Sequence, residues 1–530
     1  MNSRNARFVT LAASAALVVA AVPLLAGCAT GRAEADGGPR PTGLVARAAE
    51  PQDTALVLGS TDAAELALTA SQAFFATAPV VVVAAAGDPS AQAVAAAAAA
   101  ELTAPVLLVG GAISAEGLRT EIQRLGAVAV VEVGEEATPP GSDDTEQAAP
   151  TTSLDGLGGV QVVRLDVDAL TPDGELDPRD VDDLRAELPD RGDADVLTEV
   201  LVLAQPGETQ LAAVATARAA GALPLEVPGG DPRADAAVVE EIASAKALAV
   251  VGIGAELGTS EELAWRVRAA ESGALLPSGS QLVLPGETRA VVVEADPVTP
   301  ALEAVPAEVA DAALARASDA ADAFAAQDER TTVPVVEVAA TRLSSVAGED
   351  GDYSTEVPSA ALRPFVEAAA DAGVHVLLRF EPGGSTFEEQ VAEYADLLAD
   401  PGTGVVLDVS SRDVDGWPEV VGADEVDAAV RGVGEVVRAE GTPQKLVVLR
   451  LPEVGAVEDL AGTRVGDGEV AVVVQAVASG YTQRVALWDE VNAALPEGTL
   501  AGWTTGSQDP ARDVAGVLAL DPAPRYVAAP

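Results

Sequence analysis

From residue 54 onward, short runs of apolar residues alternate with Ala-rich stretches that have helical spacing. The runs are continuously apolar, as in 80–84 with its four consecutive valines, and do not alternate with polar residues. Strands of this kind are buried on both faces, which requires parallel sheets covered by helices. The pattern therefore predicts an α/β fold. Before residue 297 the predicted strands are 54–58, 80–84, 105–109, 127–133, 160–165, 199–203, 223–227, 247–253 and 290–294.

An internal repeat lies within this region. Residues 80–87 align with 200–207, and 129–131 align with 249–251, at one constant shift along the chain. A constant shift across several elements indicates two copies of one unit packed side by side. We expect the two copies to be flavodoxin-like parallel-sheet units that span 51–155 and 156–296. The glycine pairs at 110–111 and 229–230 recur in both copies, which predicts strand-exit turns.

A third region follows the two units. Residues 297–330 are Ala-, Asp- and Glu-rich with helical spacing, and we predict a helical linker there. Residues 331–530 then alternate predicted strands and helices in strict order, which favours a (β/α) barrel over a second doubly wound sheet. The predicted strands of this region are 333–338, 374–380, 404–408, 445–451, 469–475 and 500–504.

The segment 104–111, followed by a helix and a Val-rich strand that ends at Gly134, resembles the cell wall-binding repeat 2 family. A second, less similar occurrence spans 222–254. The resemblance implies a flavodoxin-like fold that serves as a non-covalent attachment module at bacterial cell surfaces.

The third region resembles the C-terminal barrel of a family of actinobacterial surface lipoproteins, through the segments 351–354, 381–383, 407–408 and 443–448. Members of that family carry polar motifs at the strand ends. Here Asp408 is kept, but arginines stand at 379 and 450, and Glu381 replaces a glutamine. The resemblance therefore implies a degenerate barrel, that is, a pseudoenzyme.

The N-terminus has the features of a bacterial lipoprotein signal. Two arginines precede an apolar run, and the run ends in the four-residue lipobox Leu25, Ala26, Gly27 and Cys28, which holds the only cysteine of the chain. A thiol at a cleavage site can carry more than one acyl chain, and two chains give a lasting anchor. We expect 1–27 to be removed as a signal peptide, Cys28 to be lipidated, and 28–50 to form a flexible tether. The expected location is the extracytoplasmic face of the cell membrane.

The chain is strongly acidic, with 83 Asp and Glu against 31 Lys and Arg and a formal net charge of −52. Nucleic acid is not an expected partner, because its binding depends on Lys and Arg that neutralise phosphates. The expected partners are the membrane, through Cys28, and a cell-wall polymer. The sequence does not indicate an oligomeric state.

Carboxylates follow several predicted strands of the third region, on the face where barrel active sites collect. Hydrolysis of a glycan needs two facing carboxylates about 5 to 9.5 Å apart, and Glu381 and Asp408 are the pair that we would assign to it. Ion pairs with Arg379 and Arg450 are the favoured alternative. The other carboxylates at strand ends are Glu337 and Asp509.

The chain has one histidine, His375, so no histidine triad or histidine metal cluster can form. We expect His375 to be a packed or surface residue, and we predict no cofactor and no metal site. The favoured function is non-catalytic attachment to the cell envelope. The alternatives are an envelope glycan hydrolase that uses the barrel and a solute-binding lipoprotein with its ligand between the two repeats.

Overall fold

The computed structural model describes residues 44–49, 51, 53–134, 158–295, 305–348, 351–381, 383–412, 420–464, 466 and 468–529. The chain divides into two units, Met1–Gly43 and Leu44–Pro530, and the first of them lies outside the described residues. The lipobox, with Cys28, is in that part, so lipidation stays a prediction. Among the described residues, no helix is both long and apolar enough to cross a membrane.

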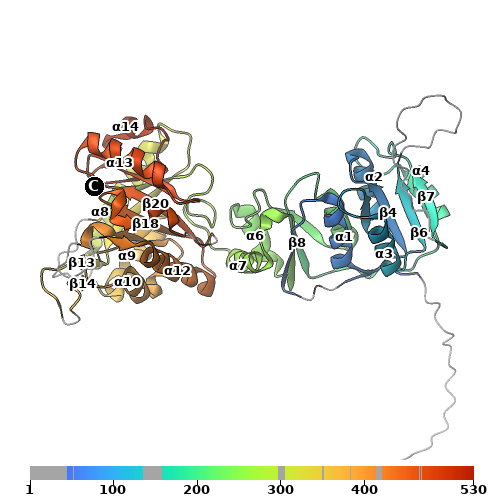
Figure 1. Cartoon of the computed structure of the whole chain (residues 1–530), viewed down its shortest axis with the longest axis horizontal. Coiled ribbons are helices and arrows are strands. Elements are labelled where there is room, and N and C mark those ends of the chain that lie inside the picture. Colours follow the sequence, from blue (N-terminus) through green and yellow to red (C-terminus); the bar gives the residue numbers. More distant parts are fainter. Residues whose placement is uncertain are drawn as a thin grey trace, which may run out of the picture. The chain divides into compact units, whose positions relative to one another are not determined.

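The first sheet is parallel and has the strand order β5-β4-β6-β7. Its centre is β4, whose four valines are each at most 1% exposed, as a strand covered on both faces requires. Helices α2 and α3 connect its strands, and α4 follows β7 (Figure 1). The bounds are β4 (Val80–Ala85), α2 (Pro89–Leu102), β5 (Val106–Val109), α3 (Ala115–Leu125), β6 (Ala129–Val133), β7 (Gln161–Leu165) and α4 (Pro178–Glu187).

The second sheet is also parallel and has the order β2-β10-β8-β9. The repeat predicted from the sequence is thus visible as equivalent central strands, β4 and β8, each beside an equivalent partner, β6 and β10. The bounds are β2 (Ala55–Leu58), β8 (Val200–Ala204), α5 (Leu211–Ala219), β9 (Leu223–Glu226), α6 (Ala236–Ala245), β10 (Ala249–Ile253), η1 (Ala255–Leu257) and α7 (Ser260–Glu271).

The predicted boundary between the two repeats is wrong for one strand on each side. Strand β2, assigned to the first unit, pairs with β10 of the second, and β7, assigned to the second unit, pairs with β6 of the first. The sequence repeat contains three strands of each sheet, β5-β4-β6 in the first and β9-β8-β10 in the second, and the choice of the fourth strand depends on pairing between distant segments. Because of this exchange, the chain first forms β2 of the second sheet, then all four strands of the first sheet, and then the other three strands of the second sheet.

Helix α1 (Ala63–Phe74) carries the chain between the two sheets and packs on α5 and β5. Its N-cap residue Asp62 accepts hydrogen bonds from the Ala64 and Glu65 amides, and also from the amide of Ala112. Gly111 has φ +64°, and a Cβ there would lie 2.7 Å from an Asp62 oxygen. The glycine pair at 110–111 is therefore a structural turn packed against a helix cap, as predicted.

Thr216 of α5 connects the two α/β repeats through a buried hydrogen bond. Strand β5 is the edge of the first sheet, and its Val106 amide donates to the Thr216 hydroxyl oxygen at 3.0 Å. That hydroxyl donates in turn to the Ala212 carbonyl at 2.9 Å. A helix of the second unit thus satisfies an edge group of the first sheet.

We expect Thr216→Val to lower the free energy of unfolding by about 1–3 kcal/mol, because it leaves the buried Val106 amide without an acceptor. Urea unfolding of the lipid-free chain measures this. Thr120→Val is the matched control, since the Thr120 hydroxyl is exposed and bonds only within its own helix turn, to Glu116. A Thr216→Val loss no larger than that of the control would contradict the bond's role.

The end of the predicted tether is part of the fold. Strand β1 (Arg47–Ala48) pairs antiparallel with β3 (Phe75–Thr77), and the Asp195 amide donates to the Ala46 carbonyl at 2.9 Å. The expectation of a flexible tether over 28–50 is therefore wrong for 44–48. A two-residue strand gives no periodic signal in the sequence, which explains the error.

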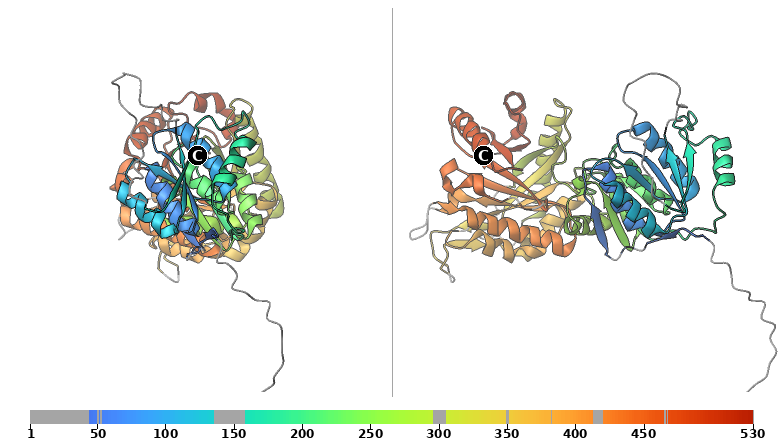
Figure 2. Two further views of the ribbon diagram at one scale, coloured as in Figure 1. Left: turned by 90° about the vertical axis from the view of Figure 1, so that its right-hand side faces the viewer. Right: turned by 45° about the vertical axis from the view of Figure 1, so that its right-hand side comes forward.

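The remaining domain, coloured mainly yellow to red in Figures 1 and 2, is a closed parallel barrel of eight strands in the described residues. The sequence predicted six of these as barrel strands and a seventh, β11, as a strand of the second repeat, and in the structure the barrel is closed. Pairing of β11 with β22 closes the ring, with Val291 opposite Val527. The strands are β11 (Arg289–Glu294), β12 (Thr332–Ala339), β15 (His375–Phe380), β16 (Thr403–Asp408), β18 (Lys445–Leu451), β20 (Val470–Ala476), β21 (Leu500–Thr504) and β22 (Tyr526–Ala528).

The barrel begins earlier in the chain than predicted. The strand at 290–294, assigned to the second repeat, is the first barrel strand β11, and the predicted linker contains α8, which packs on β11 and β12 as a barrel helix. The outer helices are α8 (Ala307–Ala325), α9 (Ser359–Asp371), α10 (Phe387–Glu393), α11 (Ala395–Leu398), α12 (Ala423–Glu440), α13 (Tyr481–Ala494) and α14 (Val514–Leu518).

Short elements decorate the loops of the barrel. Strand β13 (Thr341–Leu343) pairs antiparallel with β14 (Ser354–Glu356) directly after β12, and β17 (Val421–Gly422) pairs with β19 (Val457–Glu458). Single turns of 3-10 helix are η2 (Val409–Arg412), η3 (Val454–Ala456), η4 (Leu460–Gly462) and η5 (Pro510–Arg512).

Apolar side chains fill the barrel interior near the amino ends of the strands. One cluster joins Ala290, Val335, Leu377, Val448 and Tyr526 with the loop residues Leu276, Val283 and Leu284. That loop closes the amino end of the barrel, because the Val283 amide donates to Gln444 and Arg525 donates to the Leu284 carbonyl. The opposite, carboxyl end is the open one and carries the polar groups.

His375 begins β15 and is 3% exposed, as the packed alternative predicted. Burial lowers its pKa to about 4, from an ordinary value of 6.5. Between these two pH values the unfolded chain binds a proton that the folded chain does not, so the contribution of His375 to stability is full above pH 6.5 and falls toward pH 4.

We expect the His375 imidazole to account for about 3 kcal/mol of the stability lost between these pH values. Urea unfolding across this window should show a shallower pH dependence for His375→Gln than for the wild type, and equal slopes would contradict the assignment.

Candidate functional site

A set of polar side chains lies at the carboxyl end of the barrel, above the apolar interior. Each comes from the end of a different strand, and most are buried: Glu337 is 1% exposed, Asp408 5% and Arg450 7%. Carboxyl ends of barrel strands are where barrel active sites collect. The set, which we call the mouth cluster, contains Glu294, Glu337, Arg379, Asp408, Arg450, Gln475 and Thr504.

Glu337 lies between two arginines. One of its oxygens is 2.5 Å from Arg450 Nη2, and the other is 3.1 Å from Arg379 Nε. Strands β12 and β18 are not neighbours in the barrel, so the Glu337–Arg450 pair spans the barrel lumen. This ion pair ties opposite walls of the barrel together.

Asp408 and Glu381, the pair named from the sequence, are both within reach of the same guanidinium. Arg379 Nη1 is 2.6 Å from Glu381 Oε1 and 3.9 Å from Asp408 Oδ2. Arg450 Nη1 also lies 3.5 Å from Asp408 Oδ2, and Ser410 donates to the other oxygen of Asp408. Both carboxylates named from the sequence thus form ion pairs with arginines.

Arg450 of β18 extends the hydrogen-bond network to strands β20 and β21. Its Nε donates to Gln475 Oε1 at 3.2 Å, and Gln475 Nε2 donates to the Thr504 hydroxyl at 2.9 Å. Thr504 donates in turn to the Ala476 carbonyl. The chain of bonds fixes the Arg450 guanidinium in one orientation, as connected buried polar groups do.

The electrostatics of the mouth cluster follow from burial and from this pairing. Burial and the neighbouring Glu337 carboxylate raise the pKa of Glu294, against the effect of Arg379 and Arg450. Burial acts to lower the pKa of Arg450, but Glu337 and Asp408 outweigh it and the pKa is raised. Burial and Glu337 also raise the pKa of Tyr526. The Glu294 carboxylate therefore binds a proton more readily than that of an exposed glutamate.

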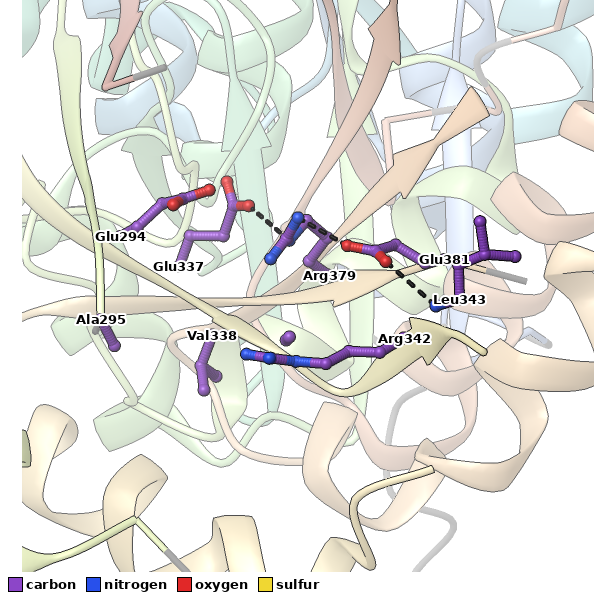
Figure 3. Close-up of a pocket in the computed structure, with 9 residues that line it drawn as sticks. Glu294, Ala295, Glu337, Val338, Arg342, Leu343, Arg379 and Glu381 are labelled. Atoms are coloured by element: carbon purple, nitrogen blue, oxygen red, sulfur yellow. Dashed lines mark hydrogen bonds and ion pairs between the residues drawn. The ribbon is translucent and has the colours of Figure 1, made fainter. Parts of the chain in front are cut away.

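A cavity of about 350 Å³ opens beside the mouth cluster (Figure 3). Figure 3 shows Glu337, Arg379 and Glu381 linked in a row, with Glu294 next to Glu337 and the side chain of Arg342 reaching toward Val338. The volume of this cavity is at the small end of the range for ligand pockets. The lining residues are Glu294, Ala295, Glu337, Val338, Ala339, Arg342, Leu343, Arg379 and Glu381.

A second cavity, of about 320 Å³, lies at the amino ends of the second sheet and is lined by Asp53, Leu197, Glu199 and Leu248 among others. Ligands of open parallel sheets bind at the carboxyl ends of the strands. This cavity therefore lies at the opposite end of the sheet from the usual ligand position.

The remaining residues named from the sequence separate into two groups. Glu381 lines the mouth cavity, and Glu337 and Asp408 belong to the mouth cluster. Asp509 is outside it, because it caps the turn η5 through the Ala511 amide and pairs with Arg512 at 3.3 Å. Among the described residues, no group of three or more His, Cys, Asp or Glu side chains is placed to hold a metal ion.

Sequence reasoning missed four residues of the site. Glu294 was assigned to another domain. Gln475 and Thr504 are uncharged residues, and their strands were predicted without any functional role for these two side chains. Arg342 lies in the loop after β12, where no strand was predicted. An assignment of 290–294 to the barrel, on the grounds that a (β/α) barrel needs eight strands, could have found Glu294.

No family model matches the chain, and no curated protein matches it. Among solved structures, "Cwp6 from Clostridium difficile" is similar over 56% of this chain and 64% of that chain, with a TM-score of 0.30 and 12% sequence identity. This chain thus spans less than two thirds of that protein's length. The resemblances to the cell wall-binding repeat 2 family and to the actinobacterial lipoproteins stay predictions.

Proposed function

We propose that this protein is a membrane-anchored protein of the cell envelope that binds a cell-wall component without catalysing a reaction. The lipobox at Cys28 supports the anchor, and the resemblance of 104–134 to wall-binding repeats supports the attachment. In this account the lipid holds the mature chain on the extracytoplasmic face of the membrane. The α/β units then contact the wall.

The observation that carries the non-catalytic part is the pairing of Glu381 and Asp408 with the same arginine, Arg379. A glycan hydrolase needs one carboxyl group that gives and takes a proton and a second that attacks or activates water. A guanidinium beside a carboxylate favours its ionised form and opposes proton transfer from it. The arrangement therefore favours binding over hydrolysis.

The anchor and the attachment can be tested separately. For the anchor, we expect incorporation of labelled palmitate into the full chain and its loss in Cys28→Ser, with the protein released from the membrane fraction. For the attachment, the lipid-free chain from residue 29 should sediment with purified cell-wall sacculi. A chain that stays in the supernatant at all protein concentrations would overturn the attachment proposal.

One observation favours a second candidate, a solute-binding lipoprotein. The mouth cavity presents charged groups of both signs around about 350 Å³, which suits a small polar ligand. A ligand that binds only the native state raises the melting temperature. A thermal-shift screen of the lipid-free chain therefore separates this candidate from simple attachment.

A further inference from the structure

Arg342 is the least satisfied charged group of the mouth cavity. It lies on β13, lines the cavity, and has a buried Nε without a hydrogen-bond partner among the described residues. The other arginine of the lining, Arg379, also has a buried Nε without a hydrogen bond, but it forms ion pairs with Glu337 and Glu381, and Arg342 forms none with the described residues. Arg342 is thus the guanidinium that remains available to a bound anion.

A carboxylate suits this guanidinium better than a phosphate does. The planar fork of arginine can bind both oxygens of a carboxylate at once. The cavity lining contains three carboxyl groups, Glu294, Glu337 and Glu381, against two arginines. A doubly charged phosphate would meet stronger repulsion there than a singly charged carboxylate, because repulsion scales with the product of the charges.

Glu294 offers the complementary group. Among the described residues its ion-pair partner is Arg450, whose Nη1 lies 3.9 Å from Glu294 Oε1, a distance too long for a hydrogen bond. Arg450 is committed to Glu337 at 2.5 Å and to Gln475. An ammonium group of a ligand could therefore lie closer to the Glu294 carboxylate than Arg450 does.

We propose that the mouth cavity binds a small zwitterion of the amino-acid type, with its carboxylate on Arg342 and its ammonium group toward Glu294. The cavity volume of about 350 Å³ fits a free amino acid or a dipeptide. This inference goes beyond attachment to the wall, which involves the other domains. It can fail or hold independently of that proposal.

The test is calorimetric titration and thermal shift on the lipid-free chain from residue 29. The probes are alanine, glutamate, lysine and alanylalanine, together with propionate, which lacks the ammonium group, and ethylamine, which lacks the carboxylate. We expect at least one zwitterion to bind and to raise the melting temperature. Neither propionate nor ethylamine should match it.

Two variants then locate the ligand. Arg342→Met should weaken binding of the zwitterion by about tenfold to a hundredfold, the usual loss for a charge-assisted hydrogen bond. Glu294→Gln should weaken the zwitterion more than it weakens propionate. Arg512→Met is the matched control, because Arg512 is exposed and pairs with Asp509 outside the cavity.

The melting temperature of each variant without ligand shows whether it is folded, and Arg342→Lys, which keeps the charge, should retain part of the binding. The proposal is overturned if none of the four zwitterions binds, if Arg342→Met binds as tightly as the wild type, or if propionate binds as tightly as the zwitterions. Sedimentation of Arg342→Met with sacculi should equal that of the wild type. That comparison keeps the outcome for the cavity separate from the outcome for wall attachment.

Discussion

Arg450→Met should lower the free energy of unfolding by about 3–5 kcal/mol, the cost of removing one partner of a buried ion pair. The substitution leaves Glu337 and Asp408, both almost fully buried, without the guanidinium that now lies 2.5 and 3.5 Å from them. It also leaves Gln475 Oε1 without its donor. Urea unfolding of the lipid-free chain at neutral pH measures the loss.

The double variant Arg450→Met, Glu337→Gln is the control for this prediction. With the buried charge of Glu337 removed, much of the lost stability should return, because the largest penalty is a buried charge that has lost one of its two guanidinium partners, and not the missing contact. A single variant as stable as the wild type would show that the two residues do not form the buried pair.

Trp503→Ala should have an effect of similar size. Trp503 is 1% exposed on β21, and its ring meets Trp488 of α13 edge to face, with centroids 5.8 Å apart. Replacing a buried tryptophan by alanine costs about 3–5 kcal/mol through lost burial and the cavity that remains. The expected consequence is a lower denaturation midpoint and loosening of α13 from the barrel wall.

Tyr481→Ala is the matched control for Trp503→Ala. Tyr481 also meets Trp503 edge to face, with centroids 6.4 Å apart, but it is 59% exposed. Its loss should cost about 1 kcal/mol or less. Equal destabilisation by the two variants would contradict the assignment of Trp503 to the core that holds helix and barrel together.

Local pattern was sufficient to predict most strands, because a run such as the valines of β4 is apolar enough to be buried wherever it pairs. Strand partners were harder. Strands β2 and β7 exchange sheets, and β11 belongs to the barrel, because pairing depends on contacts between residues far apart in the chain. Strand β22 is three residues long and too short to give a periodic signal.

In the mouth cluster, too, the residues could be predicted more readily than their partners. Arg379, Asp408 and Arg450 could be predicted, since the carboxyl ends of parallel strands meet at one end of a barrel. Their partners could not, because the pairing of Arg450 with Glu337 spans the lumen and depends on the register of every strand between them. Arg342 depends on the path of a loop, which a single sequence does not specify.

Wall binding without cleavage can be tested in one incubation of the lipid-free chain with purified sacculi, in which the sedimented protein and the released soluble sugar are both quantified. If the chain binds the wall as we propose, the protein is retained and releases no more sugar than Glu381→Gln or Asp408→Asn. Release of soluble sugar by the wild type that disappears in either variant would contradict this proposal and establish the barrel as a hydrolase.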